Sequence, residues 1–503
     1  MTARPGRPSR TELTATVVFA ASVLVICATW FFGIGQRARL FSLDIQIVRT
    51  SGIHRVFTSG VSDATDTFTL IALGTAGYLG ALWALRRGFK DSFPAAIAAC
   101  VLAGAAFLPS MPMTSPDAVH LAADVRTFWL YHRYPTHVEN APAKVDDPVT
   151  QQVVVFPNSP SGYGPLSYAI GGAALPFTGD GLRGNVLGVK IVAGAFLVLT
   201  AYLAGLLARR LGQNAALATA MVGLNPLMLW EFPGDGHNDS IMVAFGVLAL
   251  LFLVQRNWAS RGDGIGAAVA SVFSKFALVI AAPVIAAAWF PRLRLAMAAL
   301  IAVAGVALVV LVGSGWRPDF SATGPATAIA KTTPWGVIAN VTDAGPDGKD
   351  RLITAALASF MAILALIVWR HPLEKPQDIV AAIGLLLWLF LFVSSPGLLP
   401  WYQLWYFPFA VLSGRRWLVV TALVFSVGGF LPILALNWSG DMAREWSISE
   451  PVDRAVEVLW LVTTVTALAM LSADRRAGRG VSARAQRQTG ARAARRRAAR
   501  SRA

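Results

Sequence analysis

The sequence contains few cysteines and few charged residues for its length. Only two of its 503 residues are cysteine, and both Cys27 and Cys100 lie within apolar runs, which indicates buried packing and no disulfide framework. Charged residues make up 14% of the chain, well below their share in soluble globular proteins. No Walker loop, dinucleotide fingerprint, CxxC pair or HExxH motif occurs. These features argue against a soluble domain, a disulfide scaffold and the common nucleotide-binding folds.

Long apolar runs dominate the chain instead. Hydrophobic residues make up 55% of it, and the mean hydropathy is +0.57. Many runs are about 20 residues long, enough for a helix to cross a bilayer, and they lack the alternation of a membrane barrel. The sequence therefore predicts an all-α, polytopic transmembrane helical bundle of about 12 to 14 spans. The expected spans are 14–34, 67–85, 93–109, 186–208, 214–230, 240–254, 265–290, 295–313, 352–369, 379–396, 400–413, 417–436 and 455–472.

Basic residues predict how these spans are oriented. Clusters of arginine and lysine fall on alternate connections, at 86–90, 209–210, 256–261, 292–294, 370–375 and 415–416. By the positive-inside rule these connections and both chain ends are cytoplasmic. We therefore expect a multi-pass protein of the plasma membrane whose acidic and polar chemistry lies on the outer face.

The same pattern divides the chain into segments. We expect a cytoplasmic N-terminus at 1–13, a multispan domain at 14–473 with a large outer loop at 110–185, and a disordered tail at 474–503. The apolar patch 166–177 within the outer loop is too short to span and is expected to re-enter or to lie at the interface. The tail carries eleven arginines and one aspartate. Such a tail favours contact with anionic lipid headgroups over nucleic acid, so no nucleic-acid partner is expected.

Two clusters of polar residues fall in the outer loop. In SPDAVHLAAD, the residues Asp117, His120 and Asp124 are spaced by three and four, which places them on one face of a helix. A solvated amphipathic helix with Asp117 as its N-cap is the simpler alternative. Further along, GYGPLSY contains glycine and proline that predict a turn around Tyr163.

A third cluster lies between two apolar runs, in NPLMLWEFPGDGHNDSI. It comprises Glu231, Asp235, His237, Asn238 and Asp239. Helix capping alone accounts for Asn238 or Asp239, but not for a histidine, an amide and three acids together. We expect these side chains to face a water-filled cleft at the outer rim of the membrane.

The fourth cluster joins a lone cation to aromatic residues. Lys275 interrupts the apolar stretch 265–290, which is expected to form two short limbs with a turn on the outer side. A lysine within a span either snorkels to the interface or pairs with an anion. The segment PWYQLWYFP at 400–408, which includes Tyr402, fits either an interfacial aromatic belt or a binding surface. All four clusters converge on the predicted outer face.

The order of these motifs resembles a known enzyme class. An Asp-led outer loop ending in Tyr-Pro, a Y-x-P turn, NPL followed by HND, a span with Ser-Lys and a PWY motif resemble the GT-C class of polyprenyl-phosphate-sugar-dependent glycosyltransferases over roughly 100–410. Within that class the pattern is most similar to the actinobacterial α-mannosyltransferases of the cell envelope. The resemblance implies inverting transfer of a hexose, commonly mannose, from a polyprenyl-phosphate donor to an envelope glycan or glycolipid on the outer face.

The resemblance also implies roles for particular residues. The general base falls on Asp117, and Asp44, in the loop after the first span, is a competing candidate. The sequence departs from the family where Ser-Pro-Asp replaces a paired acid, where Leu121 stands near a usual tyrosine, and where the Y-P-P turn reads Tyr163-Gly164-Pro165. These departures bear on the sugar and the acceptor more than on the class.

The remaining roles follow from the chemistry of the donor and the acceptor. Carboxylates, amides and imidazoles pair with sugar hydroxyls, and cations pair with a lipid phosphate. The expected substrate-binding residues are Asp124, His120, Tyr163, Glu231, Asp235, His237, Asn238, Asp239 and Tyr402, and the expected phosphate-binding residues are Lys275, Arg183 and Lys190. No cofactor and no metal site are predicted, although His237 with Asp235 and Asp239 has donor groups that suit a divalent cation.

Two other kinds of protein remain open. A transporter or flippase of lipid-linked sugars would also need an intramembrane lysine and outer acids, but its ionisable residues are expected near the midplane and within inverted repeats. A scaffold of envelope assembly without catalytic activity is the other alternative. Consumption of a lipid-linked sugar by the purified protein separates an enzyme from both.

Overall fold

The computed structural model describes residues 9–35, 64–87, 92–110, 112, 115, 117–153, 157–255, 258–314, 334–343, 345–395, 400–431 and 458–470. All secondary-structure elements of these residues are helices, so the predicted all-α class is confirmed. Six helices are long and apolar enough to cross a membrane, and a bent pair at 215–234 makes a seventh. Five shorter apolar helices accompany them within the same residues. Asp44, the first residues of the 1–13 segment and the 474–503 tail lie outside the described residues.

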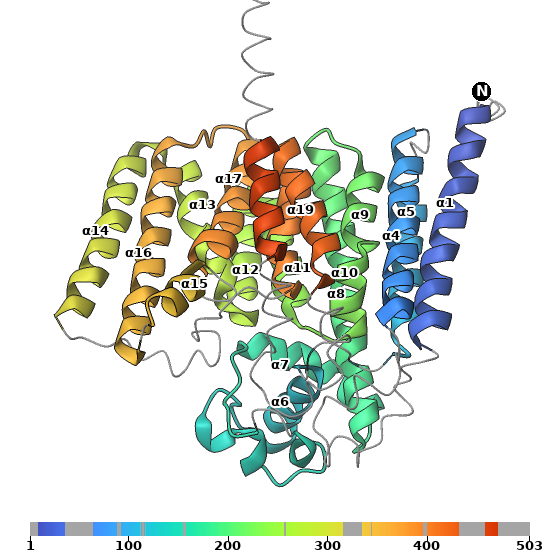
Figure 1. Ribbon diagram of the computed structural model, residues 1–503, viewed down its shortest axis with the longest axis horizontal. Coiled ribbons are helices and arrows are strands. Elements are labelled where there is room, and N and C mark those ends of the chain that lie inside the picture. Colours follow the sequence, from blue (N-terminus) through green and yellow to red (C-terminus); the bar gives the residue numbers. More distant parts are fainter. Residues whose placement is uncertain are drawn as a thin grey trace, which may run out of the picture.

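The helices run side by side in one bundle (Figure 1). α14 and α16 form one flank, and α1 and α4 form the other. The α-helices have the following bounds: α1 Arg10–Ala28, α4 Ala64–Arg87, α5 Phe93–Phe107, α6 Asp117–Tyr131, α7 Pro165–Gly171, α8 Leu182–Arg210, α9 Ala215–Gly223, α10 Pro226–Leu229, α11 Asp239–Leu253, α12 Trp258–Ser274, α13 Ala282–Trp289, α14 Arg294–Gly313, α15 Pro334–Val341, α16 Pro346–Arg370, α17 Pro376–Leu389, α18 Gln403–Leu412 and α19 Arg416–Gly428.

Basic connections gather at one end of the bundle. The Asn214 side chain donates to the Leu85 carbonyl, and the Gln213 side chain donates to the Leu412 carbonyl, which joins the ends of α4, α8 and α18. α6 and α7 lie at the opposite end, as Figure 1 shows. The chain therefore separates its clustered arginines from its outer-loop helices, as the charge pattern predicts.

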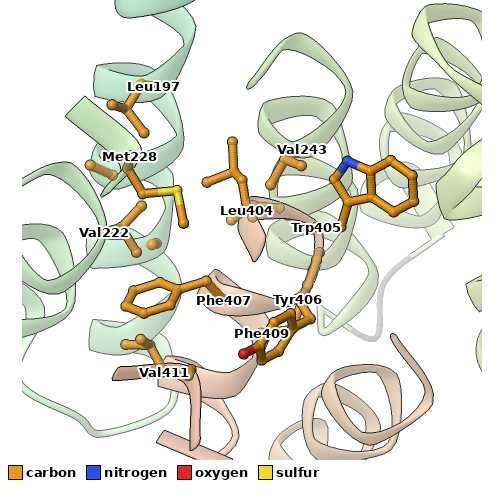
Figure 2. Packing of buried hydrophobic residues seen from close by; sticks show 14 of the residues in the cluster. Leu197, Val222, Met228, Val243, Leu404, Trp405, Tyr406, Phe407, Phe409 and Val411 are labelled. Atoms are coloured by element: carbon orange, nitrogen blue, oxygen red, sulfur yellow. The ribbon is translucent and has the colours of Figure 1, made fainter. Parts of the chain in front are cut away.

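The core around α18 holds the bundle together. Leu404, Tyr406, Phe407 and Phe409 of α18 are almost fully buried. Figure 2 shows Phe407 beside Met228 and other side chains that pack in this cluster. Burial of large apolar side chains within the protein fixes α18, and with it the aromatic residues at its N-terminal end.

A break in one span carries the third polar cluster. The side chain of Asn225 accepts from the amides of Leu227 and Met228 and so caps α10, which starts with Pro226. Because a new helix starts at Pro226, the axis of the segment Pro226–Gly234 is bent by 52° relative to the axis of α9. The chain continues as a π-helical turn, η7 (Trp230–Gly234), which positions Glu231.

The stretch 265–290 is also broken, as the sequence predicts. α12 ends at Ser274, Lys275 is extended with φ −163°, and the chain resumes as the 3-10 helix η8 (Phe276–Ala281) and α13. The apolar patch 166–177 forms α7 and the short helix η6 (Gly172–Phe177) and does not span the bundle. The site of Lys275 therefore adjoins the outer loop, because the Gly164 amide donates to the Ser274 carbonyl.

A buried ion pair organises the outer loop. Arg126 of α6 donates through Nη2 to Asp147 at 2.7 Å and to Asp180 at 2.9 Å. Asp147 is fully buried, and its Oδ1 also accepts from the amides of Val149 and Thr150, whereas the Asp180 side chain is 82% exposed. Burial raises the pKa of Asp147. Arg126 and the two amides together lower the pKa by more than burial raises it, so the pKa lies below the usual range.

This network predicts unequal effects of removing the two acids. Asp147→Ala leaves a buried guanidinium and two amides without their acceptor, and we expect a loss of about 3–5 kcal/mol in the free energy of unfolding. Asp180→Ala removes an exposed partner of the same arginine and should cost less than about 1 kcal/mol. Thermal unfolding of both variants in detergent measures the difference. Equal losses would contradict a structural role for the buried pair.

Candidate functional site

Asp117 begins α6 and faces the third cluster. Its amide donates to Ser115 Oγ at 3.1 Å, so the helix start is fixed from the preceding residues. Its Oδ2 accepts from the Tyr163 hydroxyl at 3.2 Å and lies 3.3 Å from His237 Nδ1. The first three clusters, far apart in sequence, therefore meet at this one carboxylate.

His237 lies between two carboxylates. Its Nε2 is 3.2 Å from Glu231 Oε2, and its ring stacks on Trp401 with the centroids 4.1 Å apart. Gly236, with φ +78°, lets the chain turn sharply before the histidine, and a side chain there would press on Ala118. The turn thus directs the imidazole toward the start of α6.

Lys275 lies on the opposite side of Tyr163. Its Nζ donates to Asp239 Oδ1 at 2.8 Å, and the same oxygen accepts from Trp405 Nε1 at 2.6 Å. The ammonium also lies 5.0–5.6 Å from the ring centroids of Tyr163, Tyr402 and Trp405. An aromatic enclosure of this kind stabilises a cation through its π-faces.

The Y-x-P turn fits closely against α12. Gly164 lies so near the Phe273 carbonyl that a side chain would have no room, and Ser167 Oγ donates to the Ser274 carbonyl at 2.9 Å. Only glycine permits this approach, so Gly164 holds Tyr163 between Asp117 and Lys275.

The cluster is open to solvent mainly at Asp117 and Lys275. Their side chains are 30% and 18% exposed, whereas Glu231, Asp235, His237 and Asp239 are fully buried and Asn238 is 3% exposed. The sequence predicts that the 231–239 side chains line an open cleft. The structure instead buries them, and three of them, Glu231, His237 and Asp239, form ion pairs within the protein. Direct contact of these five residues with a sugar stays a prediction.

Opposite charges shift the pKa values of Asp117 and His237. Burial raises the pKa of Asp117, but His237, Ser115 and Lys275 together lower it well below the usual range. Burial lowers the pKa of His237, which lies in the connection between η7 and α11, while the contacts with Asp117 and Glu231 raise it to about 10. Both shifts favour an ionised Asp117 and a protonated His237.

The other predicted site residues lie on α6 and α8. His120 pairs with the buried Asp124 at 3.3 Å, one turn along α6. Lys190 is fully buried in α8, where it donates to the backbone carbonyls of Leu108 at 3.0 Å and of Ser110. Arg183 is exposed at the first turn of α8. The predicted contacts of Lys190 and Arg183 with a lipid phosphate stay predictions.

Three acceptor groups come close enough together to suit a cation. Ligand atoms of Glu231, Asp235 and His237 all lie within 4.8 Å of one another. Both His237 nitrogens, however, lie within 3.3 Å of a carboxylate oxygen, the contacts expected of an ion pair. An ion pair accounts for the two histidine distances, and the absence of a metal site stays a prediction.

Sequence reasoning missed the specific roles of two tryptophans. Trp401 stacks on His237, and Trp405 bonds Asp239, although both were predicted only as part of an aromatic segment. Their spacing of four is the available signal, since it places both on one face if the segment is helical. Ser115, which accepts from Asp117, was also not singled out.

Comparison with known proteins identifies relatives of this chain. Two curated proteins of Corynebacterium glutamicum are similar to the chain. "Alpha-(1->6)-mannopyranosyltransferase A" is 28% identical over 149 residues, which cover 27% of this chain and 30% of the relative. "Alpha-(1->6)-mannopyranosyltransferase B" is 30% identical over 96 residues, which cover 19% of this chain and 16% of the relative. The matched part therefore spans less than a third of either relative.

The family match extends much further along the chain. No solved structure matches this chain. A family model described as "Alpha-(1->6)-mannopyranosyltransferase, N-terminal domain" matches residues 15–291, more than half of the sequence, and this range includes Asp117, Tyr163, His237 and Lys275. The chain belongs to the alpha-(1->6)-mannopyranosyltransferase family.

Proposed function

We propose that this protein is a membrane mannosyltransferase. It transfers a mannosyl residue from a polyprenyl-phosphate donor to a hydroxyl of a cell-envelope glycan or glycolipid on the outer face of the plasma membrane. The family and the printed names of the two relatives support the mannosyl group. The donor, the acceptor and the side of the membrane are inferred from the residues of the site.

One observation carries the proposal. Asp117 and Lys275 are the accessible charges of the cluster, and Tyr163 lies between them, bonded to the carboxylate and facing the ammonium. A base and a cation separated by one aromatic side chain suit a displacement, because the attacking hydroxyl and the departing phosphate need opposite charges. The buried acids beneath hold these two groups in place.

The reaction balances with these two groups. An acceptor hydroxyl attacks the anomeric carbon of the donor and forms the new glycosidic bond, while the bond from that carbon to the phosphate oxygen breaks. Asp117 takes the hydroxyl proton, and the polyprenyl phosphate leaves with the electron pair beside Lys275. The lipid tail remains in the bilayer throughout.

The proposed stereochemistry follows from a single displacement. One displacement inverts the anomeric carbon, so an α-linked product requires a β-linked mannosyl phosphate. The printed names of the relatives specify an α-(1->6) linkage. We propose the same linkage here, formed from a β-linked donor.

A transfer assay with purified protein tests the proposal. The protein in nanodiscs is incubated with a panel of polyprenyl-phosphate sugars and an α-(1->6)-linked mannoside, and the product linkage is determined by NMR. We expect consumption of the β-mannosyl donor and an α-(1->6) product. Movement of the intact donor between leaflets of a proteoliposome without transfer would identify a flippase instead.

The proposed orientation predicts which residues are accessible from outside the cell. In a background that carries Cys27→Ala and Cys100→Ala, Asn158→Cys lies exposed in the outer loop, and Lys375→Cys lies exposed at the basic end. We expect an impermeant maleimide to label the first in intact cells and the second only after permeabilisation, because basic connections stay cytoplasmic. Labelling of Lys375→Cys in intact cells would reverse the orientation.

A further inference from the structure

The contacts of His237 suggest a role beyond sugar binding. Its two ring nitrogens point to different elements: Nδ1 lies 3.3 Å from Asp117 of α6, and Nε2 lies 3.2 Å from Glu231 of η7. The ring is fully buried and stacked on Trp401. Neither contact has hydrogen-bond geometry, so the two short distances are those of an ion pair, and a neutral imidazole would bring no charge to either carboxylate.

The charges around the ring favour the same form. Four carboxylates lie in this cluster, those of Asp117, Glu231, Asp235 and Asp239, all but Asp117 fully buried. One ammonium group opposes them in an ion pair, that of Lys275 with Asp239, and the buried Lys190 interacts electrostatically with Asp235. A neutral His237 would remove the positive charge between Asp117 and Glu231, and a buried charge that loses compensation is unfavourable.

We propose that His237 is a positioning residue, a doubly protonated imidazolium that bridges Asp117 and Glu231 and holds the Asp117 carboxylate ionised and correctly oriented. The inference rests on the proposed function, in which Asp117 is the base. It also gives Glu231 a role, since this acid orients the imidazolium from the opposite side. The outer loop and the broken span are thereby joined at one ring.

The direction of the pH dependence follows from the contacts. Around the ring lie Asp117, Glu231 and Asp235, with Trp401 on its face, and Lys275 acts on it through Asp117. The imidazolium is fully formed below its ordinary pKa near 6.5 and is lost as the pH rises through about 10. The depressed pKa of Asp117 keeps the base ionised in mild acid, so the wild-type rate should stay constant there.

Replacing the imidazolium tests the proposal. In His237→Gln, Asp117 loses its adjacent cation, so its pKa rises. We expect the acid limb of the pH–rate profile to move up by at least about one pH unit. At pH 7 the rate should fall by about a hundredfold, the usual effect of a catalytic group displaced by 1 Å. The matched control is His137→Gln, since His137 and Glu139 form an equally short but exposed pair in the outer loop.

A second measurement, the ¹⁵N NMR spectrum of His237, requires neither sugar transfer nor the His237→Gln variant. A protein that retains His237 as its single histidine, with the other five of the six replaced, is labelled with ¹⁵N-histidine and reconstituted. We expect both ring nitrogens of His237 to show protonated shifts at pH 7.5. If the wild type transfers no sugar, the proposed function fails, while the spectrum still decides the protonation of His237.

Several results would overturn the proposal. A neutral ring in the spectrum would remove its basis. A uniform loss of rate in His237→Gln, with the acid limb unmoved, would show that the histidine only supports the fold. Loss of wild-type activity in a chelator, with recovery on addition of Mn²⁺, would reassign Glu231, Asp235 and His237 to a metal.

Discussion

Asp117→Asn is expected to lower the rate of sugar transfer by about two to four orders of magnitude, the usual contribution of general base catalysis. The amide keeps the shape of the side chain but cannot take the proton of the acceptor hydroxyl. Tyr163 and Ser115 retain a partner in the variant, since an amide oxygen accepts from the Tyr163 hydroxyl and the backbone bond to Ser115 is unchanged. The initial rate is measured in nanodiscs at saturating donor.

Two comparisons make this result specific. Asp146→Asn removes a carboxylate that is exposed in the same outer loop, where it accepts from Gln151, and should leave the rate within about twofold. Thermal unfolding confirms that both variants are folded. If Asp117→Asn transfers at a near-normal rate while Asp44→Asn does not transfer, the base lies in the earlier loop.

The sequence predicted those parts of the site that depend on local signals. Charges within apolar runs marked Lys275 and the 231–239 segment, and glycine and proline marked the turns that carry His237 and Tyr163. The division of 265–290 into two limbs was also predicted, and the break falls at Lys275. These features can be recognised in the sequence alone, because in each case the residue differs in polarity or in backbone preference from the residues next to it.

Other features depend on packing between distant segments. Trp405 and Asp239 are 166 residues apart in sequence, and they meet because α18 is buried next to α11. The burial of Glu231 and Asp235 was not predicted, because a count of acids does not reveal that a histidine from the same segment turns back onto Glu231. Lys190 is a similar case: its partners are carbonyls at the end of α5, which no sequence pattern indicates.

The arrangement also explains why a span carries so many acids. Asp117 enters from the outer loop, Glu231 from a broken helix and Asp239 from the start of α11. Each acid has a cation beside it, His237 for the first two and Lys275 for the third. A substrate phosphate that approaches Lys275 therefore competes with Asp239 for one ammonium, and the strength of donor binding depends on this competition.

Lys275→Met tests that role most directly. Loss of the ammonium should weaken donor binding by about 1–3 kcal/mol, the scale of a charge-assisted hydrogen bond, which is roughly a 5- to 150-fold rise in the apparent KM for the lipid-linked donor. The single change also leaves Asp239 as a buried unpaired acid. We therefore expect a lower Tm, which Lys275→Met with Asp239→Asn should largely restore, because the amide oxygen still accepts from Trp405.

The KM for the donor, measured in the folded double variant, then reports on the contact between Lys275 and the donor phosphate. Lys144→Met is the matched control, since it removes the same charge from an exposed position of the outer loop. We expect the KM for the donor to rise in the double variant and to stay constant in the control. An unchanged donor KM in the double variant would mean that Lys275 serves only to neutralise Asp239, because a phosphate held by this ammonium cannot bind equally well without it.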